Sequence, residues 1–295
     1  MSITNIVGLS GILTNKKVNT GVGKNGEYIS VELTLRTDEV SEHIVKLFSN
    51  KLTKDGSVSK LYESTVTVAN DYKSADEVGI ELADRVHINQ GELTVNRYMS
   101  KAGELVEMNQ ISTKFANRHE SGEFNPRAEF SVVGVVESVS QKTNEDGEIE
   151  LIKVKLNVPR GYNNQIEQIE FVVREASAFD YILESFNKWE VVKVGGQIIN
   201  KVEEVKVKSE PVGFGSMPTL GSKTVRVREL LVTGGHVLEG MNETQYYTQE
   251  EIQEGVKLLN QKIVEIKSKT PSTSAPVGFG TTAPTIQLKT SDIPF

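Results

Sequence analysis

The chain has 295 residues, enough for two domains of ordinary size and a tail, and its 37% hydrophobic and 25% charged residues are typical of a globular protein. It contains no cysteine, which excludes disulfides, thiolate metal sites and a cysteine nucleophile. The net charge of −7 argues against a nucleic-acid partner, since such proteins usually carry a basic surface, and its even spread along the chain excludes a basic arm. With no apolar run long enough to span a membrane and no signal peptide, the protein is expected in the cytoplasm without a membrane partner.

The first half of the chain predicts a β-rich domain. From Tyr28 to Thr37, apolar residues alternate with polar ones, which indicates a half-buried strand. The segment 57–83 is ambiguous between helix and loop. The other strands are expected at residues 6–13, 43–48, 85–98 and 105–115.

The second half repeats this order. Strands are expected at 130–136, 149–158 and 165–174, followed by a helix at 176–187 and two strands at 191–207 and 223–232. Three strands, a helix and two strands is the order of the OB-fold, a five-stranded Greek-key barrel that commonly binds oligonucleotides or oligosaccharides. The sequence therefore predicts a mainly β protein with two tandem OB-folds, over residues 1–126 and 127–240, with a generic small barrel or sandwich as the alternative.

The C-terminal part predicts a helix and then a tail. Thr248 and Glu251 have the spacing of a capping box, and Ile252 and Leu259 belong to one apolar stripe, so residues 241–269 are expected to contain an amphipathic helix. Packing of this stripe on its own domain is favoured over oligomerisation. Residues 270–295 are rich in Pro, Ser, Thr and Gly, a composition that predicts disorder. Pro-Val-Gly-Phe-Gly occurs twice, at 211–215 and 276–280, either by drift or because both copies compete for one surface.

Cations and aromatic rings supply the candidate binding residues. Proteins that bind single strands combine a positive surface with rings on which bases stack. Val225 and Val227 are expected to face inward, which turns the alternating arginines outward. The candidates of the second half are Lys153, Lys155, Arg160, Tyr162, Lys206, Lys208, Phe214, Arg226 and Arg228, and those of the first half are Arg97, Tyr98, Lys114 and Phe115. Tyr28 and Phe48 also lie on or beside strands, and a solvated sheet face with scattered ion pairs is the alternative to phosphate binding.

Catalytic patterns are weak. The four histidines are far apart and lack metal-ligand spacing. The segment 21–24 departs from the phosphate-loop pattern and leads into a strand, so a hairpin turn explains it better. We therefore expect no enzymatic activity, no cofactor and no metal.

The last four residues, Asp292, Ile293, Pro294 and Phe295, carry the most specific signal. An aromatic residue beside the free α-carboxylate, at the end of a disordered tail, fits capture in a partner's pocket. This tip resembles that of bacterial and phage single-stranded-DNA-binding proteins. The segments 7–13, 28–35 and 83–93 are similar to that family's opening hairpin and to its strand-turn-strand after the helix. The closest class would be a virus-encoded member with duplicated OB-folds.

The resemblance implies a protein that binds single-stranded DNA without sequence specificity during replication, recombination and repair. Its tip would recruit replication or recombination proteins, in the host cytoplasm if the protein is viral. The family's usual member has one OB-fold and forms a tetramer, so the oligomeric state does not carry over. The alternatives are a tandem-OB module that binds proteins instead of nucleic acid, and a viral structural or assembly protein. Which barrel dominates, and whether RNA is also bound, is left open.

Overall fold

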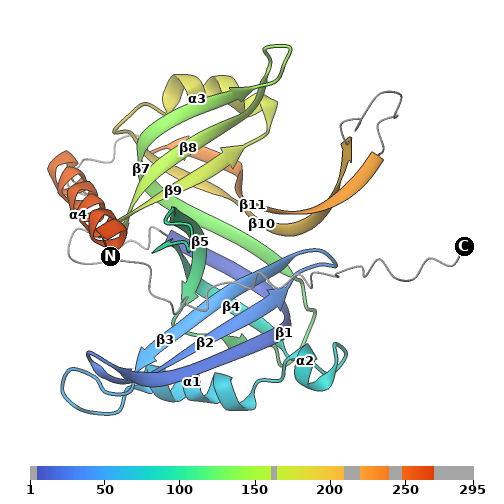
Figure 1. Ribbon diagram of the computed structural model, residues 1–295, viewed down its shortest axis with the longest axis vertical. Helices are drawn as coiled ribbons and strands as arrows, with labels where there is room; N and C mark the ends of the chain where they lie inside the picture. Colours follow the sequence, from blue (N-terminus) through green and yellow to red (C-terminus); the bar gives the residue numbers. More distant parts are fainter. Residues whose placement is uncertain (1–4, 161–164, 209–219, 239–247, 269–295) are drawn as a thin grey trace, which may run out of the picture.

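The computed structural model describes residues 5–160, 165–208, 220–238 and 248–268. Two β-barrels lie one above the other in Figure 1, and their strands belong to one 11-stranded sheet. The helices are peripheral: α1 and α2 lie under the lower barrel, α3 caps the upper barrel, and α4 lies at one side. Within the described ranges, no helix is long and apolar enough to cross a membrane.

Barrel 1 is closed by its own strand pairing. Antiparallel pairs join β1 to β2, β2 to β3, β5 to β4 and β4 back to β1, while β3 and β5 pair in parallel. The ambiguous segment between β3 and β4 contains both helices of this barrel. Its elements are β1 Asn5–Gly23, β2 Gly26–Arg36, β3 Glu42–Asn50, α1 Lys60–Asp71, α2 Ala75–Val78, β4 Arg85–Met99, β5 Leu105–Thr113 and the short β6 Asn117–Arg118.

Barrel 2 repeats this topology. Antiparallel pairs join β7 to β8, β8 to β9, β11 to β10 and β10 back to β7, and β9 pairs with β11 in parallel. This order, found twice, confirms the predicted OB-folds. The elements are β7 Arg127–Thr143, β8 Ile149–Arg160, β9 Gln165–Val173, η1 Ala176–Ala178, α3 Phe179–Ser185, β10 Val191–Lys208 and β11 Leu220–Val237.

The alternation seen in the sequence builds the core of each barrel. Leu33 and Leu35 of β2 are fully buried, as are Val154 and Leu156 of β8. The polar residues between them point to the outer face of each sheet, because successive side chains of a strand alternate. The outer faces of β2, β3 and β8 are therefore the surfaces on which a ligand could be bound.

The first strands of the two barrels join them. β1 pairs with β7 in antiparallel register, with Asn5 opposite Val132 and Ser10 opposite Arg127. The buried Asn5 side chain also donates to the carbonyl of Leu93 (2.8 Å) and accepts from its N–H (3.0 Å). The main-chain pairing of β1 with β7 fixes the orientation of one barrel relative to the other.

The helix α4, Gln249–Ser268, begins with the predicted capping box. The N–H of Thr248 donates to Glu251 Oε2 (2.8 Å), and the N–H of Glu251 donates to Thr248 Oγ1 (3.2 Å). Ile252 packs with Val135 and Ile166 of barrel 2, so the N-terminal half of the apolar stripe packs on its own chain, as predicted.

Beyond the barrel, β10 and β11 continue as a two-stranded ribbon. β10 pairs with β7 only as far as Gln197, whereas its pairing with β11 extends to Lys208. We call residues 198–208 and 220–230 the ribbon, which curves away from barrel 2 in Figure 1. Val225 is 36% exposed, so the expectation that it faces a core was wrong. The reason is that the ribbon has no barrel interior behind it.

Candidate nucleic-acid interface

The outer surface of barrel 1 carries aromatic and cationic side chains in neighbouring rows. Directly opposite residues of an antiparallel pair point to the same face. Lys17 of β1 is opposite Glu32 of β2, which is opposite Lys46 of β3. The next row contains Asn19 of β1, Ser30 of β2 and Phe48 of β3. In the third row, Gly21 of β1 is opposite Tyr28 of β2. We call Lys17, Tyr28, Lys46 and Phe48 the aromatic face.

The two rings of this face form a pair. The ring centroids of Tyr28 and Phe48 are 5.5 Å apart and the planes are tilted by 31°. Phe48 is 54% exposed, although it lies in the middle of a paired strand. Glycine at position 21 leaves room for Tyr28, because a Cβ there would come within 2.9 Å of the phenol oxygen. An exposed ring held by a strand is a surface on which a base can stack.

The two lysines lie in the row next to that of Phe48. Lys17 is exposed and Lys46 is half-buried, and neither has a carboxylate within ion-pair distance among the described residues. Glu32 lies between them in the same row. Leu47 pairs with Thr113, and the exposed Lys114, a predicted site residue, follows directly. Lys17 and Lys46 were missed by the sequence reasoning, although alternation within residues 43–48 already turns Lys46 and Phe48 to one side.

The corresponding face of barrel 2 differs in chemistry. Lys155 is opposite Glu170, and Lys153 Nζ is 2.9 Å from Glu170 Oε1. The amide of the buried Asn157 donates to Glu137 (2.8 Å) and its oxygen accepts from Gln168 (3.0 Å). Among the described residues in these rows of β8 and β9 there is no aromatic ring. The predicted positive stripe is thus partly neutralised here.

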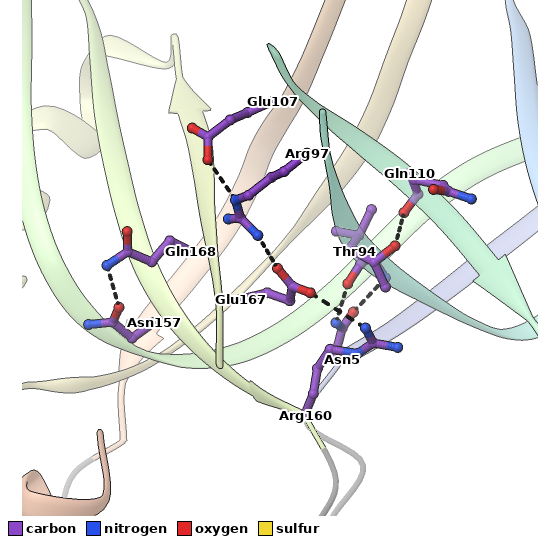
Figure 2. A network of polar contacts seen from close by, with 10 residues as sticks. Asn5, Thr94, Arg97, Glu107, Gln110, Asn157, Arg160, Glu167 and Gln168 are labelled. Carbon is purple, nitrogen blue, oxygen red and sulfur yellow. Dashed lines mark hydrogen bonds and ion pairs between the residues drawn. The ribbon is translucent and has the colours of Figure 1, made fainter. Parts of the chain in front are cut away.

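Two of the predicted cations lie between the barrels. Arg97 bridges Glu107 (2.6 Å) of its own hairpin and Glu167 (2.8 Å) of barrel 2, and its side chain is only 7% exposed. Arg160 lies 3.5 Å from both Glu167 and Glu92. Figure 2 shows Arg97 and Arg160 pointing toward Glu167 from different strands. These guanidinium groups therefore link the barrels in this structure.

The ribbon carries the two remaining predicted arginines. Arg226 and Arg228 are exposed, and neither forms an ion pair with a described residue. Burial is the largest influence on Arg228 and lowers its pKa, and the charge of Arg226 lowers it further; an electrostatic interaction with Tyr98 acts in the opposite direction. Tyr98 belongs to barrel 1, so the fold brings predicted residues of both halves near each other.

The other predicted residues have mixed outcomes. Phe115 is half exposed, as a stacking residue needs to be, and Tyr98 is half-buried with its hydroxyl 3.6 Å from Met108 Sδ. Lys206 and Lys208 lie on β10. Several predicted features lie outside the described residues: Tyr162, Phe214, both Pro-Val-Gly-Phe-Gly copies and the tip Asp292, Ile293, Pro294 and Phe295.

Two histidines that are far apart in the sequence meet in the structure. His87 Nε2 lies 2.8 Å from His119 Nδ1, and His87 Nδ1 lies 2.8 Å from Ser10 Oγ. The ring of Phe124 packs against both imidazoles. Burial and the charges of His119 and Arg127 lower the pKa of His87. The contact between His87 of β4 and His119, which follows β6, joins the segment after β6 to barrel 1. No group of three or more metal-ligating side chains occurs among the described residues.

The strand order and pairing, found twice, define a protein of two tandem OB-folds. The chain belongs to the YorF family, whose family model matches residues 4–269. The curated proteins include none that matches it. Among solved structures, the wild-type single-stranded DNA binding protein from Thermus aquaticus is 13% identical, with a TM-score of 0.48, over 79% of this chain and 92% of that one. A replication protein A heterotrimer bound to ssDNA is 12% identical, with a TM-score of 0.25, over 87% of this chain and 54% of that one.

Proposed function

We propose that this protein is a non-enzymatic binder of single-stranded DNA that tolerates any base sequence. The observation that supports this most is the aromatic face, where the exposed Phe48 and its neighbour Tyr28 lie beside the row that carries Lys17 and Lys46. Rings stack on any base and lysines attract the backbone phosphates, so this chemistry binds single strands without reading their sequence. In a duplex the bases are already stacked and their faces are not available.

The proposal extends to the biological role predicted from the sequence. The two barrels, residues 1–126 and 127–240, protect single strands during replication, recombination or repair. The tip Asp292–Phe295 recruits partner proteins through its carboxylate and apolar side chains. Lys114, Lys155 and Phe115 are further contacts to the strand. A net charge of −7 is compatible with this function, because binding depends on the cations that line one surface.

A titration of a fluorescent oligonucleotide tests the proposal. We expect tight binding to a thymidine oligomer and much weaker binding to the matching duplex. The logarithm of the binding constant should fall with the logarithm of the salt concentration, at a slope of about −0.7 for each phosphate neutralised. Equal affinity for single strand and duplex would reject the proposal, and an absence of binding to either would favour a module that binds proteins.

A further inference from the structure

The ribbon of barrel 2 docks on barrel 1 at the start of β3. The N–H of Val202 donates to the carbonyl of Val40 (3.1 Å), and the side-chain amide of Asn200 donates to the carbonyl of Glu42 (2.5 Å). An isolated β-bridge also joins Ser41 to Lys201. Glu42 is the first residue of β3, the strand that carries Lys46 and Phe48. The ribbon is therefore held at one end of this strand.

The side of the ribbon that faces barrel 1 is the side that carries the arginines. Asn200 is opposite Arg228 and Val202 is opposite Arg226 in the β10–β11 register. Opposite residues of an antiparallel pair share a face. Because the side chain of Asn200 reaches the carbonyl of Glu42, the two arginines lie on the side turned toward barrel 1. The electrostatic interaction between Arg228 and Tyr98 of barrel 1 agrees with this orientation.

The charges of these arginines are available to a ligand. Arg97 and Arg160 each contact carboxylates, whereas Arg226 and Arg228 have no ion pair among the described residues. The two guanidinium groups lie on one face of one strand, where their charges repel each other. Partial burial is the main cause of the lowered pKa of Arg228, and the charge of Arg226 lowers it further. An anion placed between them would relieve this repulsion.

A row of outward side chains connects the two ends of β3. From Glu42 to Phe48 the strand spans about 20 Å at about 3.3 Å per residue. Lys46 lies between these positions on the same side, and Arg36 is opposite Glu42 on β2. The surface between the rings and the ribbon thus carries two cations, Lys46 and Arg36, each opposite a glutamate. A nucleic-acid strand whose bases stack on Tyr28 and Phe48 can place its phosphates beside Lys46 and Arg36 and continue toward Arg226 and Arg228.

We infer that the two barrels form one shared groove for a single nucleic-acid strand, in which barrel 1 stacks the bases and the ribbon of barrel 2 holds the phosphates through Arg226 and Arg228. This inference depends on the proposed function and adds to it. Each protein chain binds one continuous nucleic-acid strand, whose bases contact barrel 1 and whose phosphates contact the ribbon of barrel 2. Two barrels acting separately would each hold a strand of their own.

The salt dependence of binding tests the shared groove. The variant in which Arg226 and Arg228 are both replaced by glutamine keeps long polar side chains and removes two charges. With a thymidine oligomer of about 16 nucleotides, the log–log slope should become shallower by about 1.4, which is about 0.7 for each lost phosphate contact. The control replaces the exposed Lys257 and Lys262 of α4 by glutamine, which removes the same charge away from the groove, and its slope should equal that of the unaltered protein.

A short oligomer separates the two parts of the groove. About 4 nucleotides can occupy the aromatic face without reaching the ribbon, so the arginine variant should bind this oligomer as well as the unaltered protein does. Unchanged salt dependence with the long oligomer, or two strands bound per chain, would overturn the shared groove while leaving the proposed function intact. Failure of the unaltered protein to bind any oligomer would overturn both. Circular dichroism and thermal unfolding of each variant show whether it is folded.

Discussion

The ring of Phe48 lies 5.5 Å from that of Tyr28 on the outer surface of barrel 1, although an apolar ring is usually buried when a core is available to it. The strand register explains this exposure. Val45 and Leu47 occupy the inward positions of β3, so Phe48 has to point outward. An exposed ring gains little stability for the fold, so Phe48 can be replaced to test binding with little effect on folding.

Replacing Phe48 by alanine should weaken binding to a thymidine oligomer by about 1–3 kcal/mol, which is the value of one base stacked on a ring. Because the side chain is largely exposed, the free energy of unfolding should change by less than about 1 kcal/mol. Fluorescence anisotropy measures the first quantity and urea unfolding the second. Tyr181→Ala, which removes an exposed ring from α3 of barrel 2, is the control and should bind normally. Equal losses in both variants would argue against the aromatic face.

Deleting Asp292–Phe295 should abolish the capture of partner proteins and leave affinity for single-stranded DNA unchanged or slightly higher. The reason is that the tip supplies the α-carboxylate and the aromatic anchor, whereas the barrels supply the DNA contacts. A pull-down with the full-length and shortened proteins measures the first effect, and an oligonucleotide titration the second. Recovery of the same partners by the shortened protein would contradict the assigned role of the tip.

Acid should destabilise the protein through His43. This side chain is 2% exposed, and its Nδ1 has no hydrogen-bond partner among the described residues. Burial lowers its pKa from 6.5 to about 4. Between these values the unfolded chain binds a proton that the folded protein does not, so the free energy of unfolding falls as the pH decreases from about 6.5 to about 4, by up to about 3 kcal/mol.

Urea unfolding across this pH range measures the effect of His43. The variant His43→Leu, which places an apolar group beside Leu35 inside barrel 1, should lose less stability on acidification than the unaltered protein. The exposed His236, also replaced by leucine, provides the control. If the His43 and His236 variants follow the same pH profile as the unaltered protein, buried His43 is not the group responsible.

Replacing Arg97 by methionine should destabilise the protein by about 3 kcal/mol, because it leaves Glu167, which is 14% exposed, with only the longer contact to Arg160. The control is Lys142→Met, which breaks an exposed pair with Glu150 and should cost less than about 1 kcal/mol. Urea unfolding compares the two. A cost below about 1 kcal/mol for both variants would mean that the Arg97–Glu167 pair does not stabilise the junction between the barrels.

The sequence alone determined the repeated barrels, because the alternation of apolar and polar residues and the order of strands and helix are local patterns. It also determined the start of α4, where Thr248 and Glu251 are only three residues apart. The ambiguous segment 57–83 could not be assigned in the same way, since helix α1 has only three buried residues, Thr65, Val68 and Ala69.

Only the tertiary structure decided which cations face a ligand. Arg97 and Arg228 look alike in the sequence, yet Arg97 meets a glutamate from another barrel, whereas Arg228 meets none among the described residues. Likewise, Lys17, Tyr28 and Phe48 come from three strands, and only the strand register places them in adjacent rows. The physical reason is that the availability of a charge or a ring depends on neighbours distant in the chain, which local patterns do not specify.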